Sequence, residues 1–186
     1  MPKLKYIHGD LFEHEYDPAR CTIIAHVCND QGVMGKGFVV PLAQTFPWAK
    51  EAYVNWFKDN PVQYDTKILG ELQTPSRGQT QMAVVQDKPN VVVANMVAQD
   101  LGSDRPLHYN DLVKCMEQVA HSLEVQAGAE IICPMFGSAL AGGDWKFIEE
   151  LITDCWLNKD IPVTVYYLEQ FLSADMVAWI NWDESN

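Results

Sequence analysis

The stretch that most constrains the fold runs from residue 25 to residue 38 and reads AHVCNDQGVMGKGF. It begins at the end of an apolar run, Cys21–Ala25, whose length and composition are typical of a buried strand. Three glycines follow, and then an apolar segment, Phe38–Phe46, that is long enough for a short helix. Glycines let backbone N–H groups approach a ligand, and a helix N-terminus favours negative charge. The stretch therefore predicts an anion site, most simply for the phosphates of a nucleotide diphosphate.

The spacing of these glycines excludes two standard phosphate motifs. Gly35-Lys36 is followed by Gly37 instead of Ser or Thr, so the loop is not a P-loop. No glycine stands at the third position after Gly37, so the dinucleotide-binding fingerprint is absent as well. The anion site must therefore be of another kind.

A second glycine-rich loop, residues 134–143, follows the apolar run Ile131–Cys133 and precedes a helical pattern that Asp144 can cap. In α/β folds, ligands bind outside the C-terminal ends of strands, where two such loops can face each other. The two loops together predict a clamp on a diphosphate.

Strands and helices alternate through the second half of the chain, and a more β-rich stretch lies in the middle. This pattern favours an α/β fold in which helices cover a mixed sheet, and the length of 186 residues suits a single domain. We expect strands at 3–7, 21–26, 69–73, 82–86, 91–96, 131–133 and 162–168. We expect helices at 38–46, 48–60, from the N-cap Asn110 to Gly128, from Asp144 to Cys155, and at 174–182.

The charge of the chain argues against a nucleic-acid partner. Its formal net charge is −12 and its sequence pI is about 4.6, with 13 scattered basic residues. Because a protein that binds DNA or RNA through phosphates needs a basic face, we expect no long nucleic acid as a partner. A small anion remains possible, since backbone N–H groups need no net positive charge. The sequence shows neither a signal-peptide core nor a run of membrane-spanning length, so we expect no membrane partner.

The five cysteines indicate reduced thiols. They stand at positions 21, 28, 115, 133 and 155, and none forms a C-x-x-C pair. An odd count without metal spacing is typical of a cytoplasmic protein that holds no metal, and we expect no cofactor. All of them except Cys28 fall within apolar patterns and are expected to be small core residues.

Five motifs stand along the chain: Ile7–Leu11 (IHGDL), Ala25–Asn29 (AHVCN), Met34–Gly37 (MGKG), Pro134–Leu140 (PMFGSAL) and Val165–Leu168 (VYYL). They occur in the order found in macrodomains, and the chain resembles that family from about residue 3 to residue 168. Its closest likeness is to the branch that holds the yeast ADP-ribose 1″-phosphate phosphatase and the terminal ADP-ribose protein glycohydrolase. The resemblance implies a three-layer α/β/α sandwich with a mixed central sheet, ADP-ribose or an ADP-ribosyl derivative as the ligand, and a C-terminal extension at 169–186.

The resemblance also implies where the ligand lies. Asp10 would accept a hydrogen bond from the adenine amino group, with Leu11, Tyr166 and Leu168 near the base, and Asn29 would face the distal ribose. The first loop would wrap the distal ribose and a phosphate, and the second would close over the diphosphate. The full implied ligand set is Asp10, Leu11, His26, Asn29, Met34, Gly35, Lys36, Gly37, Phe38, Asn95, Pro134, Phe136, Gly137, Ser138, Ala139, Leu140, Tyr166 and Leu168.

Several of these residues have a purely structural alternative. Asp10 can belong to a Gly-Asp turn, and Asn29 can cap its own turn. Lys36 can be a surface charge. Tyr166 and Leu168 can be core residues on pattern alone.

His26 is the residue most relevant to chemistry. It matches the histidine that the branch carries in its second strand, and an imidazole transfers protons readily near neutral pH. The resemblance therefore implies a chemical role at the distal ribose. The alternative is a structural histidine hydrogen-bonded to backbone.

The chain departs from the glycohydrolase at two catalytic positions. The lysine nucleophile of that relative corresponds to Met96, or to Asn95 with a slip of one residue, and neither side chain has an amine. Its catalytic aspartate falls on Ala141, and the nearest carboxylate is Asp144, which can equally be a helix cap. Two possibilities remain. Either water attacks with assistance from His26 or Asp144, or the chain catalyses no reaction.

Two functions from different classes therefore follow. The preferred one is a hydrolase that acts at the distal ribose of an ADP-ribose derivative, either ADP-ribose 1″-phosphate or an ADP-ribosyl ester. The alternative is a non-catalytic module that binds ADP-ribose. Another nucleotide-binding α/β protein is a third possibility.

Overall fold

The two longest strands pair in parallel at the centre of the sheet. They are β2 (Thr22–Asn29) and β5 (Lys88–Gln99), and their registered pairs include Ile24 with Val93. Every residue from 91 to 98 is buried, and only Val27 is partly exposed in β2. Continuous apolar runs of this kind are typical of strands covered on both faces.

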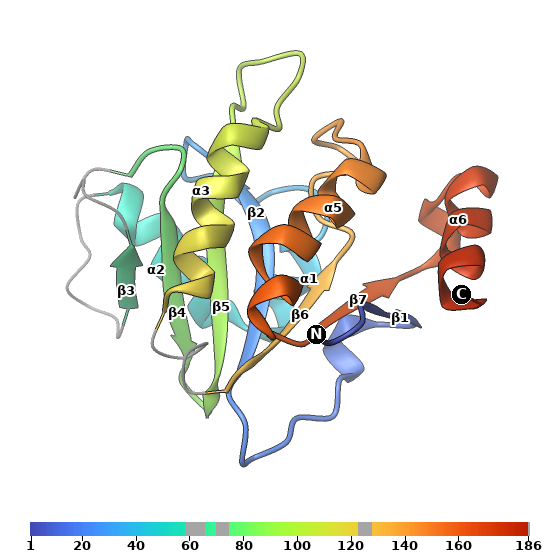
Figure 1. Cartoon of the computed structure of the whole chain (residues 1–186). Helices are drawn as coiled ribbons and strands as arrows, with labels where there is room; N and C mark the ends of the chain where they lie inside the picture. The colour runs from blue at the N-terminus through green and yellow to red at the C-terminus, as the bar shows by residue number, and fades with distance from the viewer. Residues whose placement is uncertain (59–65, 70–74, 123–127, 186) are drawn as a thin grey trace.

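The computed structural model describes residues 1–58, 66–69, 75–122 and 128–185. In this part of the chain seven strands form one sheet in the order β1-β7-β6-β2-β5-β4-β3 (Figure 1). The first five in this order run parallel to their neighbours, and β4 and β3 are added antiparallel at one edge. The other strands are β1 (Lys5–His8), β3 (Thr66–Leu69), β4 (Thr80–Val85), β6 (Glu130–Pro134) and β7 (Val163–Tyr167).

Helices cover both faces of this sheet (Figure 1). One face carries α1 (Val39–Thr45) and α2 (Pro47–Phe57), and the other carries α3 (Tyr109–Ala120) and α5 (Trp145–Cys155). A last helix, α6 (Ala174–Ser185), lies beyond the β7–β1 edge. Short 3-10 helices stand at Leu11–Glu13 (η1), Leu157–Lys159 (η3) and Glu169–Phe171 (η4). The mixed sheet between two helical layers confirms the predicted α/β sandwich.

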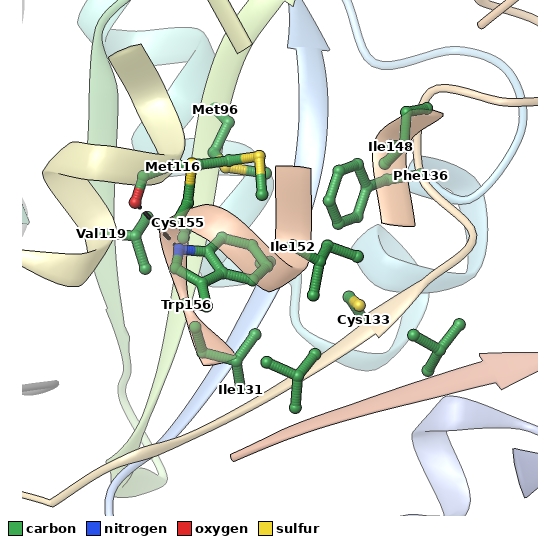
Figure 2. Close-up of a cluster of buried hydrophobic side chains, with 14 of the residues drawn as sticks. Met96, Met116, Val119, Ile131, Cys133, Phe136, Ile148, Ile152, Cys155 and Trp156 are labelled. Carbon is green, nitrogen blue, oxygen red and sulfur yellow. Dashed lines mark hydrogen bonds between the residues drawn. The ribbon is translucent and has the colours of Figure 1, made fainter. Parts of the chain in front are cut away.

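The two faces of the sheet bury different sets of side chains. Val92, Ala94 and Met96 of β5 belong to the core under α3 and α5, where Figure 2 shows Met96 near Met116. Val91 and Val93 belong to the core under α1 and α2. Because side chains alternate along a strand, residue 95 faces the α1–α2 layer and residue 96 the opposite one.

Most expected elements are present, with shifted ends. The N-cap of α3 was predicted wrongly: His108 caps it with extended backbone, and Asn110 lies inside the helix. The helix begins earlier because Leu112 N already donates to His108 O at 2.9 Å. The cap of α5 is confirmed, since the Asp144 side chain accepts from Lys146 N. Most of the strand expected at 69–73, and residues 123–127 of the predicted third helix, lie outside the described residues.

All five thiols are free, and the four at positions 28, 115, 133 and 155 are buried. Cys21 is partly buried and packs against the α3–α5 core. In the described part of the chain, no helix is long and apolar enough to cross a bilayer. No group of three or more metal-ligating side chains gathers there either.

Candidate ligand site

The first glycine-rich loop is folded by Asn29, the last residue of β2. Its Oδ1 accepts from Gln31 N at 3.0 Å and Val33 N at 3.3 Å, and its Nδ2 donates to Val33 O at 2.5 Å. The hydroxyl of Tyr53 donates to the Asn29 carbonyl at 2.5 Å. The side chain therefore caps its own turn, which is the structural alternative given by the sequence. Its predicted contact with the distal ribose stays a prediction.

The two glycine-rich loops meet at Gly37 and Leu140. Gly37 has a φ of +75°, and a Cβ at this position would lie 3.2 Å from Leu140 Cδ1. The Leu140 side chain is 70% exposed, so it contacts the first loop at the protein surface. Around Gly35 nothing lies within 4 Å of an added Cβ, which leaves the backbone there open to a ligand. The tertiary fold thus brings together two loops that are about a hundred residues apart in the sequence.

Each loop contains backbone N–H groups that find no acceptor among the described residues. Those of residues 35–37 and 139–140 donate no hydrogen bond to another described residue. All five of these residues are exposed, including Lys36. Backbone N–H groups that are left unpaired in a loop can bind an anion. The loops can therefore hold phosphate oxygens without a cationic side chain.

The second loop is braced by its own hydrogen bonds. Ser138 Oγ donates to Met135 O at 2.8 Å, and Gly143 N donates to Gly137 O at 2.8 Å. Asp144 follows as the cap of α5, with Oδ1 accepting from Lys146 N at 3.0 Å. These bonds brace the backbone, while the N–H groups of residues 139 and 140 donate to no described residue. The Asp144 carboxylate is exposed but engaged in capping, and its catalytic role stays a prediction.

One predicted ligand residue has its side chain elsewhere. Phe136 is 3% exposed and packs in the α3–α5 core, with its ring centroid 6.0 Å from that of Trp145 and 6.1 Å from that of Trp156 (Figure 2). This places the Phe136 ring on the face of the sheet opposite α1 and α2. Any contribution of residue 136 to a ligand would come from its backbone, which follows the partly buried Pro134 at the end of β6.

The predicted adenine end lies beside η1. The exposed Asp10 carboxylate caps this helix through Phe12 N at 2.9 Å. Leu11 and Tyr166 are buried together in the α1–α2 core, and Tyr166 OH lies 2.8 Å from His14 Nδ1. Leu168 is partly buried one residue after β7. The four residues therefore gather at one end of the sheet, and their contact with an adenine stays a prediction.

An aromatic pair that the sequence analysis missed joins this end to the first loop. The rings of Phe12 and Phe38 are stacked, with centroids 5.4 Å apart and an interplanar angle of 17°. Phe38 also packs on the imidazole of His26, with centroids 5.7 Å apart. The sequence does show an aromatic residue, Phe12, directly after the Asp10-Leu11 motif. No local pattern, however, indicates that Phe38 is its partner.

His26 lies beneath this aromatic pair and is 1% exposed. Its Nε2 is 2.6 Å from Asn95 Oδ1, and Asn95 Nδ2 donates to Gln81 Oε1 at 3.1 Å. Both partners are also buried, at 0% and 1% exposed. Gln81 was missed by the sequence analysis, although a glutamine within an apolar strand is itself a signal. Of Asn95 and Met96, only Asn95 lies on the same face of the sheet as His26.

Burial sets the ionisation of this cluster. It lowers the pKa of His26 to about 4, and the hydrogen bonds to Asn95 and to the backbone of Val27 offset only part of the effect. Burial likewise raises the pKa of the Cys28 thiol well above its ordinary value. Cys28 Sγ lies 3.8 Å from both imidazole nitrogens. At neutral pH the pair is therefore an uncharged imidazole beside an uncharged thiol.

A groove of about 780 Å³ adjoins the first loop. It begins at Met34 and Gly35 and runs between α1 and α2 past Lys50 and Lys58. Asp10 and the second loop do not line it. The groove therefore provides room next to the loop, outside the place where the two loops meet.

Comparisons with curated proteins identify two yeast relatives of nearly full length. Both are named ADP-ribose 1″-phosphate phosphatase. The protein from Candida albicans is 22% identical over 158 residues, or 81% of this chain and 92% of the relative. The one from Lodderomyces elongisporus is 24% identical over 157 residues, or 80% and 90%. A scan against models of known protein families finds no match.

Solved structures give a closer likeness. A macrodomain protein from Streptomyces coelicolor is 32% identical, with a TM-score of 0.70 over 88% of this chain and 98% of that one. A protein from Bacteroides thetaiotaomicron is 30% identical, with a TM-score of 0.73 over 89% and 100%. Thermosipho africanus DarTG, solved in complex with ADP-ribose, shares the fold at 17% identity, with a TM-score of 0.64 over 95% and 44%.

We expect the burial of His26 to make the fold less stable in acid. Its pKa is about 4 in the fold and about 6.5 in the unfolded chain, so between these values the unfolded state binds more protons. The free energy of unfolding should therefore fall as pH decreases, by up to about 1.4 kcal/mol per pH unit from this residue. Urea unfolding of wild type and His26→Gln from about pH 7 to about pH 4.5 measures the effect.

The variant keeps an amide that can donate to Asn95 but cannot become charged in this range. The stability difference between the two proteins should therefore change in favour of His26→Gln as the pH is lowered. Parallel pH profiles for the two would contradict the assigned ionisation.

Proposed function

This chain belongs to the macrodomain family, and from that premise we propose that it binds ADP-ribose across its two glycine-rich loops. The observation that carries the proposal is the contact of Gly37 with Leu140, which joins two loops whose residues 35–37 and 139–140 donate no backbone hydrogen bond to a described residue. The names of the yeast relatives and the ADP-ribose complex of Thermosipho africanus DarTG support this ligand.

The diphosphate would lie against the backbone of residues 35–37 and 139–140. The adenine would reach Leu11 and Tyr166 at one end, with the exposed Asp10 carboxylate accepting from its amino group. The distal ribose would lie at Met34 and the loop that follows it. The adjoining groove would receive whatever group is attached to that ribose.

Addition of ADP-ribose should raise the melting temperature. A ligand that binds only the folded state at about a hundred times its Kd stabilises it by roughly 2.7 kcal/mol. AMP should do less, because it lacks the distal half of the ligand. Uridine and guanosine nucleotides are the controls that show whether the site selects adenine. A melting temperature that does not change with ADP-ribose at millimolar concentration would contradict the proposal.

Asp10→Asn should separate base recognition from folding. The amide oxygen can still cap η1 through Phe12 N, so the melting temperature of the free protein should stay close to that of wild type. The carboxylate acceptor is lost, and a hydrogen bond to a charged group contributes roughly 1.5–3 kcal/mol. Calorimetry should therefore show ADP-ribose binding weakened by about tenfold or more. Unchanged affinity would mean that the adenine lies elsewhere.

A catalytic function is the second candidate, and two observations favour it. Both nearly full-length yeast relatives are named as phosphatases, and a neutral imidazole lies beneath the Phe38 ring. The reaction would be attack of water on the phosphorus of ADP-ribose 1″-phosphate, with cleavage of the bond to the ribose oxygen. Its products would be ADP-ribose and inorganic phosphate. Because His26 is buried, Phe38 must move for water to reach it. An ADP-ribosyl ester is the alternative substrate.

Phosphate release from ADP-ribose 1″-phosphate tests this candidate, with an ADP-ribosylated protein as the second substrate. Positioned proton transfer contributes about 10²–10⁴-fold, so His26→Gln should lower turnover within that range while ADP-ribose affinity changes little. Asp144→Ser keeps a capping oxygen but removes the carboxylate, so unchanged turnover would limit Asp144 to its structural role. If wild type turns over neither substrate, the chain is a module that binds ADP-ribose without chemistry.

A further inference from the structure

A row of three buried polar side chains crosses the centre of the sheet. His26 of β2 is in register with Asn95 of β5, and Asn95 is in register with Gln81 of β4. All three lie on the face covered by α1 and α2, because Asn95 and Gln81 reach backbone carbonyls of α2. Such a row is costly unless every group is paired in a definite direction.

The carbonyls of α2 fix that direction. Gln81 Nε2 is 3.0 Å from Ala52 O, and a carbonyl only accepts, so the Gln81 amide oxygen must face Asn95. Asn95 Nδ2 then donates to Gln81 Oε1 at 3.1 Å and to Ala49 O at 3.4 Å. Turning the Asn95 amide over would set its oxygen against two acceptors in a site without solvent.

The orientation of the Asn95 amide also determines which imidazole nitrogen of His26 carries the hydrogen. Asn95 Oδ1 lies 2.6 Å from His26 Nε2, and this oxygen can only accept. Nε2 must therefore carry the hydrogen. A neutral imidazole has one N–H, so the lone pair is on Nδ1.

We infer that Asn95 and Gln81 are positioning residues that hold His26 in its Nε2–H tautomer and so make Nδ1 its proton acceptor. This inference rests on the proposed hydrolysis for its functional meaning. As water attacks the phosphorus, its O–H bond breaks and the proton passes to Nδ1. The bond from phosphorus to the ribose oxygen breaks, and that oxygen takes the proton back from the imidazole. Asn95, whose amide is engaged within the protein, acts through His26 and not on the ligand.

Nitrogen-15 NMR of histidine-labelled protein reads the tautomer directly. The sequence has five histidines, and His26→Gln identifies the signal of interest. Wild type should show a pyrrole-type shift at Nε2 and a pyridine-type shift at Nδ1. Gln81→Met keeps the size of the side chain but removes the anchor to α2. It should shift the tautomer populations and lower turnover of ADP-ribose 1″-phosphate by at least about tenfold, with ADP-ribose affinity unchanged.

Gln118→Met is the matched control. The Gln118 amide also makes two hydrogen bonds, to Gly78 O and from Thr80 N at 2.9 Å each, but α3 places it on the opposite face of the sheet. It should lower stability without changing the His26 signal or turnover.

The outcomes separate this inference from the proposed function. A hydrogen on Nδ1 in wild type, or the wild-type signal retained in Gln81→Met, overturns the positioning role whatever the activity. If wild type has the Nε2–H signal but no turnover, the tautomer assignment is supported and the hydrolysis is contradicted. The wild-type spectrum alone decides the tautomer, even if Gln81→Met fails to fold.

Discussion

The parallel pairing of β2 with β5 is the constraint on which the rest of the structure depends. Both strands are buried on both faces, so their register is fixed by packing on either side. That register sets His26 beside Asn95, and the neighbouring pairing with β4 adds Gln81. It also directs Asn29 to the end of the sheet, where the first loop begins. A slip of one residue would send each of these polar groups to the other face.

The proposed anion site belongs to an acidic protein. The chain has a formal charge of −12, yet its candidate site needs no cluster of cations. Backbone N–H groups supply the partial positive charge, and glycine at the close approach of Gly37 to Leu140 leaves them accessible. Asn29 in one loop and Ser138 in the other hold the backbone so that these groups are not satisfied locally.

The buried row from His26 to Gln81 links stability to chemistry. A charged imidazole would be poorly solvated there, so the fold keeps it neutral, and the α2 carbonyls decide which nitrogen bears the hydrogen. The core therefore contains three polar side chains that must be hydrogen-bonded in one direction, whereas apolar side chains would pack there without that requirement. Met96 lies on the opposite face of the sheet, in the core under α3 and α5.

The sequence by itself determined the fold class, because apolar runs, glycine loops and helical periodicity are local properties. It also indicated both loops and the Asp144 cap. Only the tertiary structure decided which side chains meet. The stack of Phe12 on Phe38, the place of Phe136 in the α3–α5 core and the bond from His26 through Asn95 to Gln81 each join segments distant in sequence. Local patterns cannot specify them, because strand register and helix docking arise from packing summed over the whole sheet.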